Sequence, residues 1–235
     1  MTTLVALFSL FFSAPCRHLA AVGLCLMLAG GCTALKPVAS PVSPDFYSLD
    51  RAGTSVPSVP SVPSVPRVPP VDAPALVVGM PAAAAGFDSQ RIIYTRQAHK
   101  LESFAHSEWI DPPARMLAPL IVAAIKGSGA FRAVVRAPSP AAGDLRLDTE
   151  VLQLQHEFDN QPSRVRFALR VYLVEEATRR IVASRDFESV AMALSDDPYG
   201  GVVAANVVVA GVLENLATFC AEVAANWRPA SAASR

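Results

Sequence analysis

Residues 164–174 carry the pattern that most constrains the fold, a strict alternation of apolar and polar side chains. The apolar members are Val165, Phe167, Leu169, Val171 and Leu173, with Arg166 and Arg170 on the opposite face. Successive side chains of a β-strand point to opposite faces, so the pattern predicts a strand with one buried and one solvated face. Segments 145–158 and 179–192 have a similar period, and residues 175–180 supply a turn between strands. The three segments are predicted to form an antiparallel meander.

Shorter apolar segments predict further strands of the same sheet. They are residues 46–49, 75–80, 91–95 and 131–135, with a weaker candidate at 100–105. Within 145–158 the alternation shifts at Leu152, which predicts a β-bulge at that position.

A first helix is predicted where apolar residues recur at three- and four-residue steps between 116 and 125. Asp111 is its expected N-cap and Pro112 its first residue, because proline has no N–H to leave unpaired there. Gly127 or Gly129 is expected to end it, since glycine readily adopts the left-handed conformation of a helix C-terminus.

A final long helix is predicted to start at Asp197 and Pro198 and to run to about Trp227. Its apolar stripe consists of Val202, Val209, Leu213, Leu216, Cys220, Val223 and Trp227, with Asn206 as the polar exception. Such a wide stripe should lie across the sheet. The predicted fold class is α+β, a mostly antiparallel sheet with two helices packed on one face, preceded by a signal peptide and a Pro-rich segment.

An export signal precedes this domain. An apolar run at 19–28 follows Arg17 and closes on Leu28-Ala29-Gly30-Gly31-Cys32, and it is too short for a bilayer span of about 20 residues. With cysteine after the cut, the pattern resembles the bacterial lipobox, which implies a lipid on Cys32. By the same resemblance, Thr33 implies sorting to the outer membrane. The alternative is a plain signal peptide cleaved near 29–31, with Cys32 a free thiol.

The chain is therefore divided into a lipoprotein signal peptide, a tether, one domain and a tail. The predicted ranges are 1–31, 32–45, 46–228 and a disordered tail at 229–235. Residues 51–74 form a Pro-rich segment whose SVP repeat favours polyproline II, because proline fixes φ and supplies no N–H. We favour a loop insertion if 46–49 is a strand of the domain, and the alternative is a spacer.

Charge and residue spacing exclude several functions. Lys and Arg balance Asp and Glu at 20 each, so nothing indicates nucleic-acid binding. His99, His106 and His156 have no metal-ligand spacing, and no glycine-rich phosphate loop or nucleophile motif is present. Cys220 lies among apolar residues and is expected to be a buried, inert thiol. We predict no enzyme activity, no metal and no cofactor beyond the covalent lipid on Cys32.

Two segments that precede helices contain residue types common in binding surfaces. The candidate partner contacts are Trp109, Asp111, Pro112, Arg115, Asp197, Pro198 and Tyr199. These residues have a simpler interpretation, in which they only start the two helices. Partner contact is the alternative, because Trp, Tyr and Arg dominate interface hot spots.

Several motifs resemble, in order and spacing, the ABC-type transport auxiliary lipoprotein family, which includes paraquat-inducible protein C. They are Cys32, FYSLD at 46–50, LVVGM at 76–80, RIIYTR at 91–96, LESFAHSEWIDPPARML at 101–117, GDLRLDTEVLQL at 143–154, RVRFALRVYLV at 164–174 and DDPYGG at 196–201. The resemblance covers nearly all of the chain after the signal except the SVP repeat.

The resemblance implies a non-enzymatic lipoprotein of the outer membrane that faces the periplasm. Its implied partners are an MCE-domain periplasmic protein, an inner-membrane ABC permease and its ATPase, which together move phospholipids or other hydrophobic molecules between membranes. Docking of the MCE protein is the expected role, and direct lipid binding stays open. One alternative is a structural envelope lipoprotein that binds peptidoglycan or an assembly machine. A periplasmic hydrolase is a third, but it requires a polar catalytic cluster that the sequence lacks.

Overall fold

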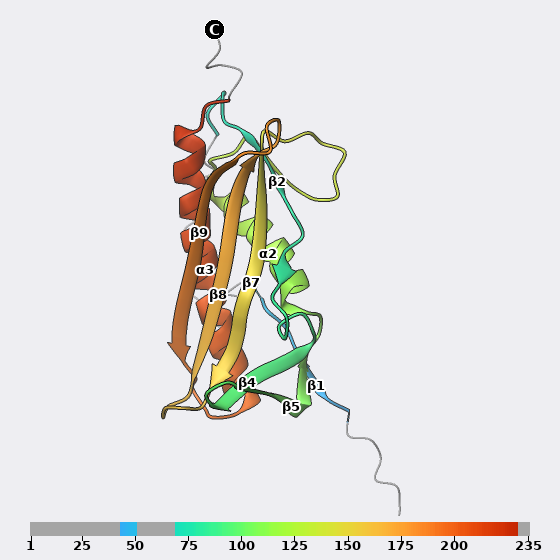
Figure 1. Cartoon of the computed structure of the whole chain (residues 1–235), viewed down its shortest axis with the longest axis vertical. Helices are drawn as coiled ribbons and strands as arrows, with labels where there is room; N and C mark the ends of the chain where they lie inside the picture. The colour runs from blue at the N-terminus through green and yellow to red at the C-terminus, as the bar shows by residue number, and fades with distance from the viewer. Residues whose placement is uncertain (1–42, 51–68, 230–235) are drawn as a thin grey trace, which may run out of the picture. The chain divides into compact units, whose positions relative to one another are not determined.

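The computed structural model describes residues 43–50 and 69–229, which belong to one compact unit, Ser43–Arg235. The signal peptide, Cys32, most of the tether, residues 51–68 and residues 230–235 lie outside the described residues. The described part forms a nine-stranded sheet with two helices on one face, which is the predicted α+β fold (Figure 1).

The predicted meander is confirmed and forms the largest part of the sheet. β7 (Leu145–Glu157) pairs antiparallel with β8 (Arg164–Glu175), and β8 pairs antiparallel with β9 (Ile181–Met192). The register of β7 against β8 passes directly from Val151 to Gln153, so Leu152 is the bulge residue, as predicted.

The other edge of β7 pairs in turn with three short parallel strands. These are β2 (Ala75–Val78), β3 (Ala82–Ala83) and β4 (Arg91–Gln97). β6 (Ala133–Arg136) pairs parallel with β2 on its outer side. None of the three is long enough to cover the 13 residues of β7, so each covers one part of it. The sheet is mixed, with its long pairings antiparallel.

β4 also pairs antiparallel with β5 (Lys100–Trp109), and β1 (Asp45–Tyr47) pairs parallel with β5. β5 is longer than the strand predicted at 100–105, because it continues to Trp109 beside Tyr47. Leu49, two residues after β1, is buried in the same core. Residues on both sides of the SVP repeat thus belong to one sheet and core, which supports the insertion interpretation; that interpretation remains a proposal.

The first helix, α2 (Pro113–Ser128), starts one residue later than predicted. Its N-cap is Pro112, and no side chain caps it, so the assignment of Asp111 as N-cap is wrong. Asp111 instead forms an ion pair with Arg115 one turn ahead, at 3.4 Å. α2 ends at Gly129, whose φ of 66° is left-handed and whose N–H reaches the carbonyl of Lys126.

The last helix, α3 (Pro198–Asn226), begins and ends where the sequence predicts. The Asp197 side chain accepts a hydrogen bond from the Gly200 N–H at 2.7 Å, as an N-cap does. By length and composition, α3 is the one described helix that could cross a membrane. More than half of its most apolar window is buried inside the domain, however, as is usual for a core helix.

Asn206, the polar exception in the α3 stripe, binds the chain just after β1. Its side-chain oxygen accepts from the Asp50 N–H at 2.7 Å, and its amide nitrogen donates to the Ser48 carbonyl at 3.2 Å. An amide side chain supplies one acceptor and two donors, so it can pair with extended backbone in the way that another strand does. This contact fixes the end of the β1 segment to α3.

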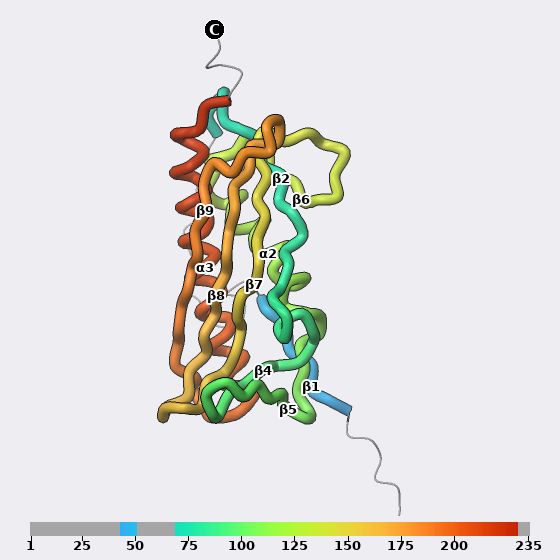
Figure 2. The backbone as a smooth tube through the Cα atoms, in the orientation of Figure 1, coloured from blue at the N-terminus to red at the C-terminus, as the bar shows by residue number. Residues whose placement is uncertain are grey.

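The main core lies between the sheet and the two helices, which also contact each other (Figures 1 and 2). Its largest fully buried side chains include Phe167, Leu147, Leu169, Leu117, Ile121 and Leu216. Complete burial of one such side chain stabilises a fold by about 1.5–3 kcal/mol. On the opposite face of β8, Arg166 pairs with Glu157 and Glu188, and Arg170 pairs with Asp186. The predicted buried and solvated faces of β8 are thus confirmed.

Candidate functional site

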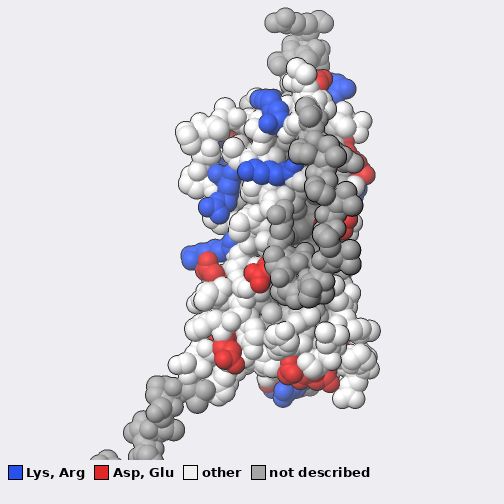
Figure 3. Space-filling model, turned by 180° about the vertical axis from the view of Figure 1, so that it is seen from behind, with Lys and Arg blue, Asp and Glu red and all other residues white. Residues whose placement is uncertain are grey.

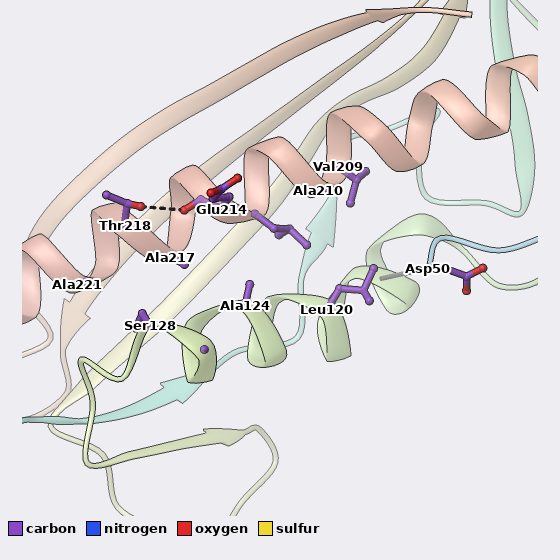
Figure 4. Close-up of a pocket in the computed structure, with 12 residues that line it drawn as sticks. Asp50, Leu120, Ala124, Ser128, Val209, Ala210, Glu214, Ala217, Thr218 and Ala221 are labelled. Atoms are coloured by element: carbon purple, nitrogen blue, oxygen red, sulfur yellow. Dashed lines mark hydrogen bonds between the residues drawn. The ribbon is translucent and has the colours of Figure 1, made fainter. Parts of the chain in front are cut away.

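An apolar groove of about 470 Å³ runs between α2 and α3 (Figure 4). It exists because both helices have small residues where they face each other. These are Ala124, Gly127 and Ser128 of α2 and Ala210, Ala217 and Ala221 of α3. Seen from the helix side, much of the visible surface is uncharged (Figure 3).

The chemistry of the groove suits apolar groups. Leu120, Val209 and Leu213 supply its larger apolar surfaces, and Asp50 and Glu214 also line it. The Thr218 hydroxyl, which could bind a ligand, already donates to the Glu214 backbone carbonyl at 3.1 Å (Figure 4). Such a lining can hold an alkyl chain or the apolar side chains of another segment.

The groove adjoins a second hollow of about 770 Å³, because Ser128 and Ala221 line both. This hollow extends to Ala73, Asp144 and Trp227 near the C-terminal end of α3. The second hollow is more polar than the groove, because Asp72, Arg132, Asp144 and Arg228 also line it. No local sequence pattern indicates the groove, since it depends on how two distant helices approach each other.

The residues of the first predicted contact segment differ in how far they are exposed to solvent. Trp109 is only 3% exposed and belongs to the core, so the expectation that its ring contacts a partner is corrected. The ring is buried because Trp109 is the last residue of β5 and points toward the core. Asp111 and Pro112 are half-buried, and Arg115 is exposed. Of this segment, Arg115 and its ion-pair partner Asp111 stay available to a partner.

The second predicted contact segment is largely explained by helix geometry. Asp197 is the N-cap and Pro198 is the first helical residue of α3. The hydrogen bond from the Gly200 N–H holds the pKa of Asp197 below its usual value. Gly200 has no room for a side chain, since an added Cβ would lie 2.3 Å from the Ser195 carbonyl oxygen. Tyr199, at 65% exposure, is the member of this segment that stays a candidate contact.

The two contact segments are connected through β1. The Ile110 N–H donates to the Tyr47 carbonyl at 2.7 Å, and Asn206 of α3 binds Ser48 and Asp50, one and three residues further along. Residues near both helix starts are therefore hydrogen-bonded to the β1 segment.

A buried polar cluster, not predicted from the sequence, lies beneath the start of α3. His156 Nε2 and Ser163 Oγ are 2.8 Å apart, and the Ser163 N–H donates to Asp196 at 3.0 Å. The ring of Phe158 lies 4.1 Å from the imidazole, centroid to centroid. Gly201 presses on the other part of the ring, where an added Cβ would lie 2.5 Å from Nδ1.

This cluster does not have the geometry of a catalytic triad. In a triad the acid orients the histidine, whereas here Asp196 binds Ser163. His156 and Ser163 are both buried, so no substrate reaches them in this conformation. Burial lowers the pKa of His156, and hydrogen bonds from Ser163 lower that of Asp196. The cluster holds β7, β8 and the start of α3 together.

Within residues 43–50 and 69–229, no group of three or more His, Cys, Asp or Glu side chains could hold a metal ion. Cys220 is buried, and burial raises the pKa of its thiol to about 12, which agrees with the predicted inert thiol.

The described structure is thus an α+β domain with an apolar groove between its two helices, a feature typical of domains that bind hydrophobic groups. A sequence model of the ABC-type transport auxiliary lipoprotein component family matches residues 47–217. The chain belongs to this family, and the resemblance noted from its motifs is confirmed.

Two solved structures share the fold. Protein XCC0632 from Xanthomonas campestris is similar over 77% of this chain and 97% of its own, with 23% identity and a TM-score of 0.64. An uncharacterised protein is similar over 76% of this chain and 99% of its own, with 15% identity and a TM-score of 0.56. At these identities the likeness shows the fold alone. A search of curated proteins found no match.

Proposed function

We propose that this protein is a non-enzymatic lipoprotein component of an MCE-type ABC transport system, which moves phospholipids or other hydrophobic molecules between the inner and outer membranes. The observation that carries the proposal is the family match over residues 47–217, which spans both helices' starts and the whole meander. The match supports association with an ABC transporter. The MCE partner is our extension of it.

We propose further that Cys32 carries the lipid and that the domain faces the periplasm from the outer membrane. The lipobox-like sequence at 28–32 and Thr33 after the cysteine support this placement. The role proposed for the domain is to dock the MCE-domain protein at that membrane. The apolar groove between α2 and α3 is compatible with a role in handling hydrophobic molecules.

Within the docking role, Arg115 and Tyr199 are the proposed contacts. Both are exposed, both lie next to a helix start, and Tyr and Arg are enriched among residues that dominate binding energy. Asp111, Pro112, Asp197 and Pro198 are proposed to support these two side chains by fixing the helix starts.

Site-specific photo-cross-linking in cells tests the docking role. A photoreactive residue is placed at Arg115 or Tyr199, with Arg179 in the β8–β9 turn as the exposed control. We expect an MCE-domain protein in the products from 115 and 199 and not in those from 179. Products that contain only peptidoglycan or assembly proteins would favour the structural alternative, and products without any partner at 115 and 199 would refute these contacts.

A further inference from the structure

One end of the described unit has exposed apolar side chains beside the exposed acidic residues Asp159, Asp196 and Asp197. β9 runs to this end and the chain then turns into the start of α3, and β1 lies at the same end (Figure 1). The exposed apolar residues at the end of β9 are Val190, Met192 and Leu194, which we call the apolar end. Met192 is 62% exposed and Leu194 86% exposed. Grouped exposure of this kind marks a contact surface more often than a neutral one.

The outward face of β9 changes character along the strand. Asp186 and Glu188 are exposed on this face and form ion pairs with arginines of β8. Val190 and Met192 follow at the same two-residue step and therefore lie on the same face, and Leu194 continues the series beyond the strand. The outward face of β9 thus carries ion-paired carboxylates in the middle of the strand and exposed apolar side chains at its end.

The length of the preceding chain indicates what this end meets. Residues 33–42 separate Cys32 from Ser43, the first described residue, which lies directly before β1. Ten residues reach at most roughly 35 Å when extended, and a flexible chain of that length averages about 18 Å. A lipid on Cys32 therefore holds the end that contains β1 within one such length of the bilayer.

We propose that the apolar end rests in the interfacial region of the bilayer in which the Cys32 lipid is anchored. This inference rests on the lipid attachment contained in the proposed function. At that depth the apolar side chains are removed from water, which is favourable, and this free energy adds to the membrane binding supplied by the acyl chains. The contact also sets an orientation: the end of β9 faces the membrane, and the C-terminal end of α3 points away from it.

The acylated protein, purified from cells and reconstituted in vesicles of phosphatidylethanolamine and phosphatidylglycerol, allows a direct test. Nitroxide labels are attached one at a time to Met192→Cys and Leu194→Cys. The control is Ile181→Cys, which is 56% exposed at the opposite end of the same strand. Cys220 is buried and does not compete for the label. The readout is the relative accessibility of each label to oxygen, which concentrates in lipid, and to a water-soluble nickel complex.

We expect the labels at 192 and 194 to be several-fold more accessible to oxygen, relative to nickel, than the label at 181. Equal nickel accessibility at all three positions would overturn the inference, and it would leave the proposed function intact if mass spectrometry finds the acylated Cys32. Protection at 192 and 194 from both reagents would also overturn it, since a protein surface would then cover this end. An unacylated Cys32 would instead refute the lipid attachment in the proposed function, and with it the inference.

Discussion

Replacing Gly201 with alanine should destabilise the protein, although alanine is the better helix former. The new Cβ would lie 2.5 Å from His156 Nδ1 and 3.0 Å from Cε1, inside the contact distance of carbon and nitrogen atoms. The imidazole cannot easily move, because Ser163 holds its other nitrogen and Phe158 packs on its face. Overpacking typically costs about 1–3 kcal/mol, and because the imidazole is held, this site should fall in the upper half of that range, about 2–3 kcal/mol, against which helix propensity returns about 1 kcal/mol. The expected net loss is about 1–2 kcal/mol in the free energy of unfolding.

Gly211 provides the matched control in the same helix, because an added Cβ there meets nothing within 4 Å. Gly211→Ala should stabilise the protein by about 0.5–1 kcal/mol through propensity and reduced unfolded-state entropy. For a domain of this size the two variants should differ in Tm by roughly 3–12 °C. Thermal unfolding of the mature chain, followed by circular dichroism, measures both. An increase in Tm for Gly201→Ala that matches that of Gly211→Ala would refute the close contact with His156.

Three further predictions concern the polar contacts and the thiol. Asn206→Leu leaves the Asp50 N–H and the Ser48 carbonyl without their partner, so it should lower the free energy of unfolding by about 1–2 kcal/mol. Urea denaturation measures this, and an unchanged value would contradict the backbone pairing. The lowered pKa of His156 means that the unfolded chain binds this proton more tightly, so its contribution to stability should be complete above about pH 6.5 and be lost as the pH falls below that value. His156→Gln should therefore flatten the decline in stability below about pH 6.5. Cys220, with its pKa raised to about 12, should resist iodoacetamide in the native protein and react in urea, and rapid native labelling would contradict its burial.

The long elements could be predicted because their patterns are local. The two-residue period of β8 specifies which face is buried, and the shift at Leu152 alone indicates the bulge. The start and end of α3 also follow from local signals, an aspartate N-cap before a proline and an apolar stripe. Pattern and capping chemistry were sufficient for these elements.

The remaining features depend on pairings between distant residues. A four-residue strand such as β2 does not show from its sequence which neighbour it joins or in which direction. The cluster beneath α3 joins residues 156, 163, 196 and 201, which no single window contains. Partner contact by Trp109 is an alternative that the sequence leaves open, because aromatic residues are frequent in binding surfaces, and only the full length of β5 shows that the ring belongs to the core.

Co-purification tests the central claim most directly. The mature protein, solubilised from membranes in a mild detergent and isolated through a C-terminal tag, is examined by mass spectrometry for the proteins that accompany it. We predict recovery of an MCE-domain protein together with its permease and ATPase. Recovery of peptidoglycan fragments or envelope assembly factors without any MCE-domain protein would contradict the proposed transport role and favour a structural lipoprotein.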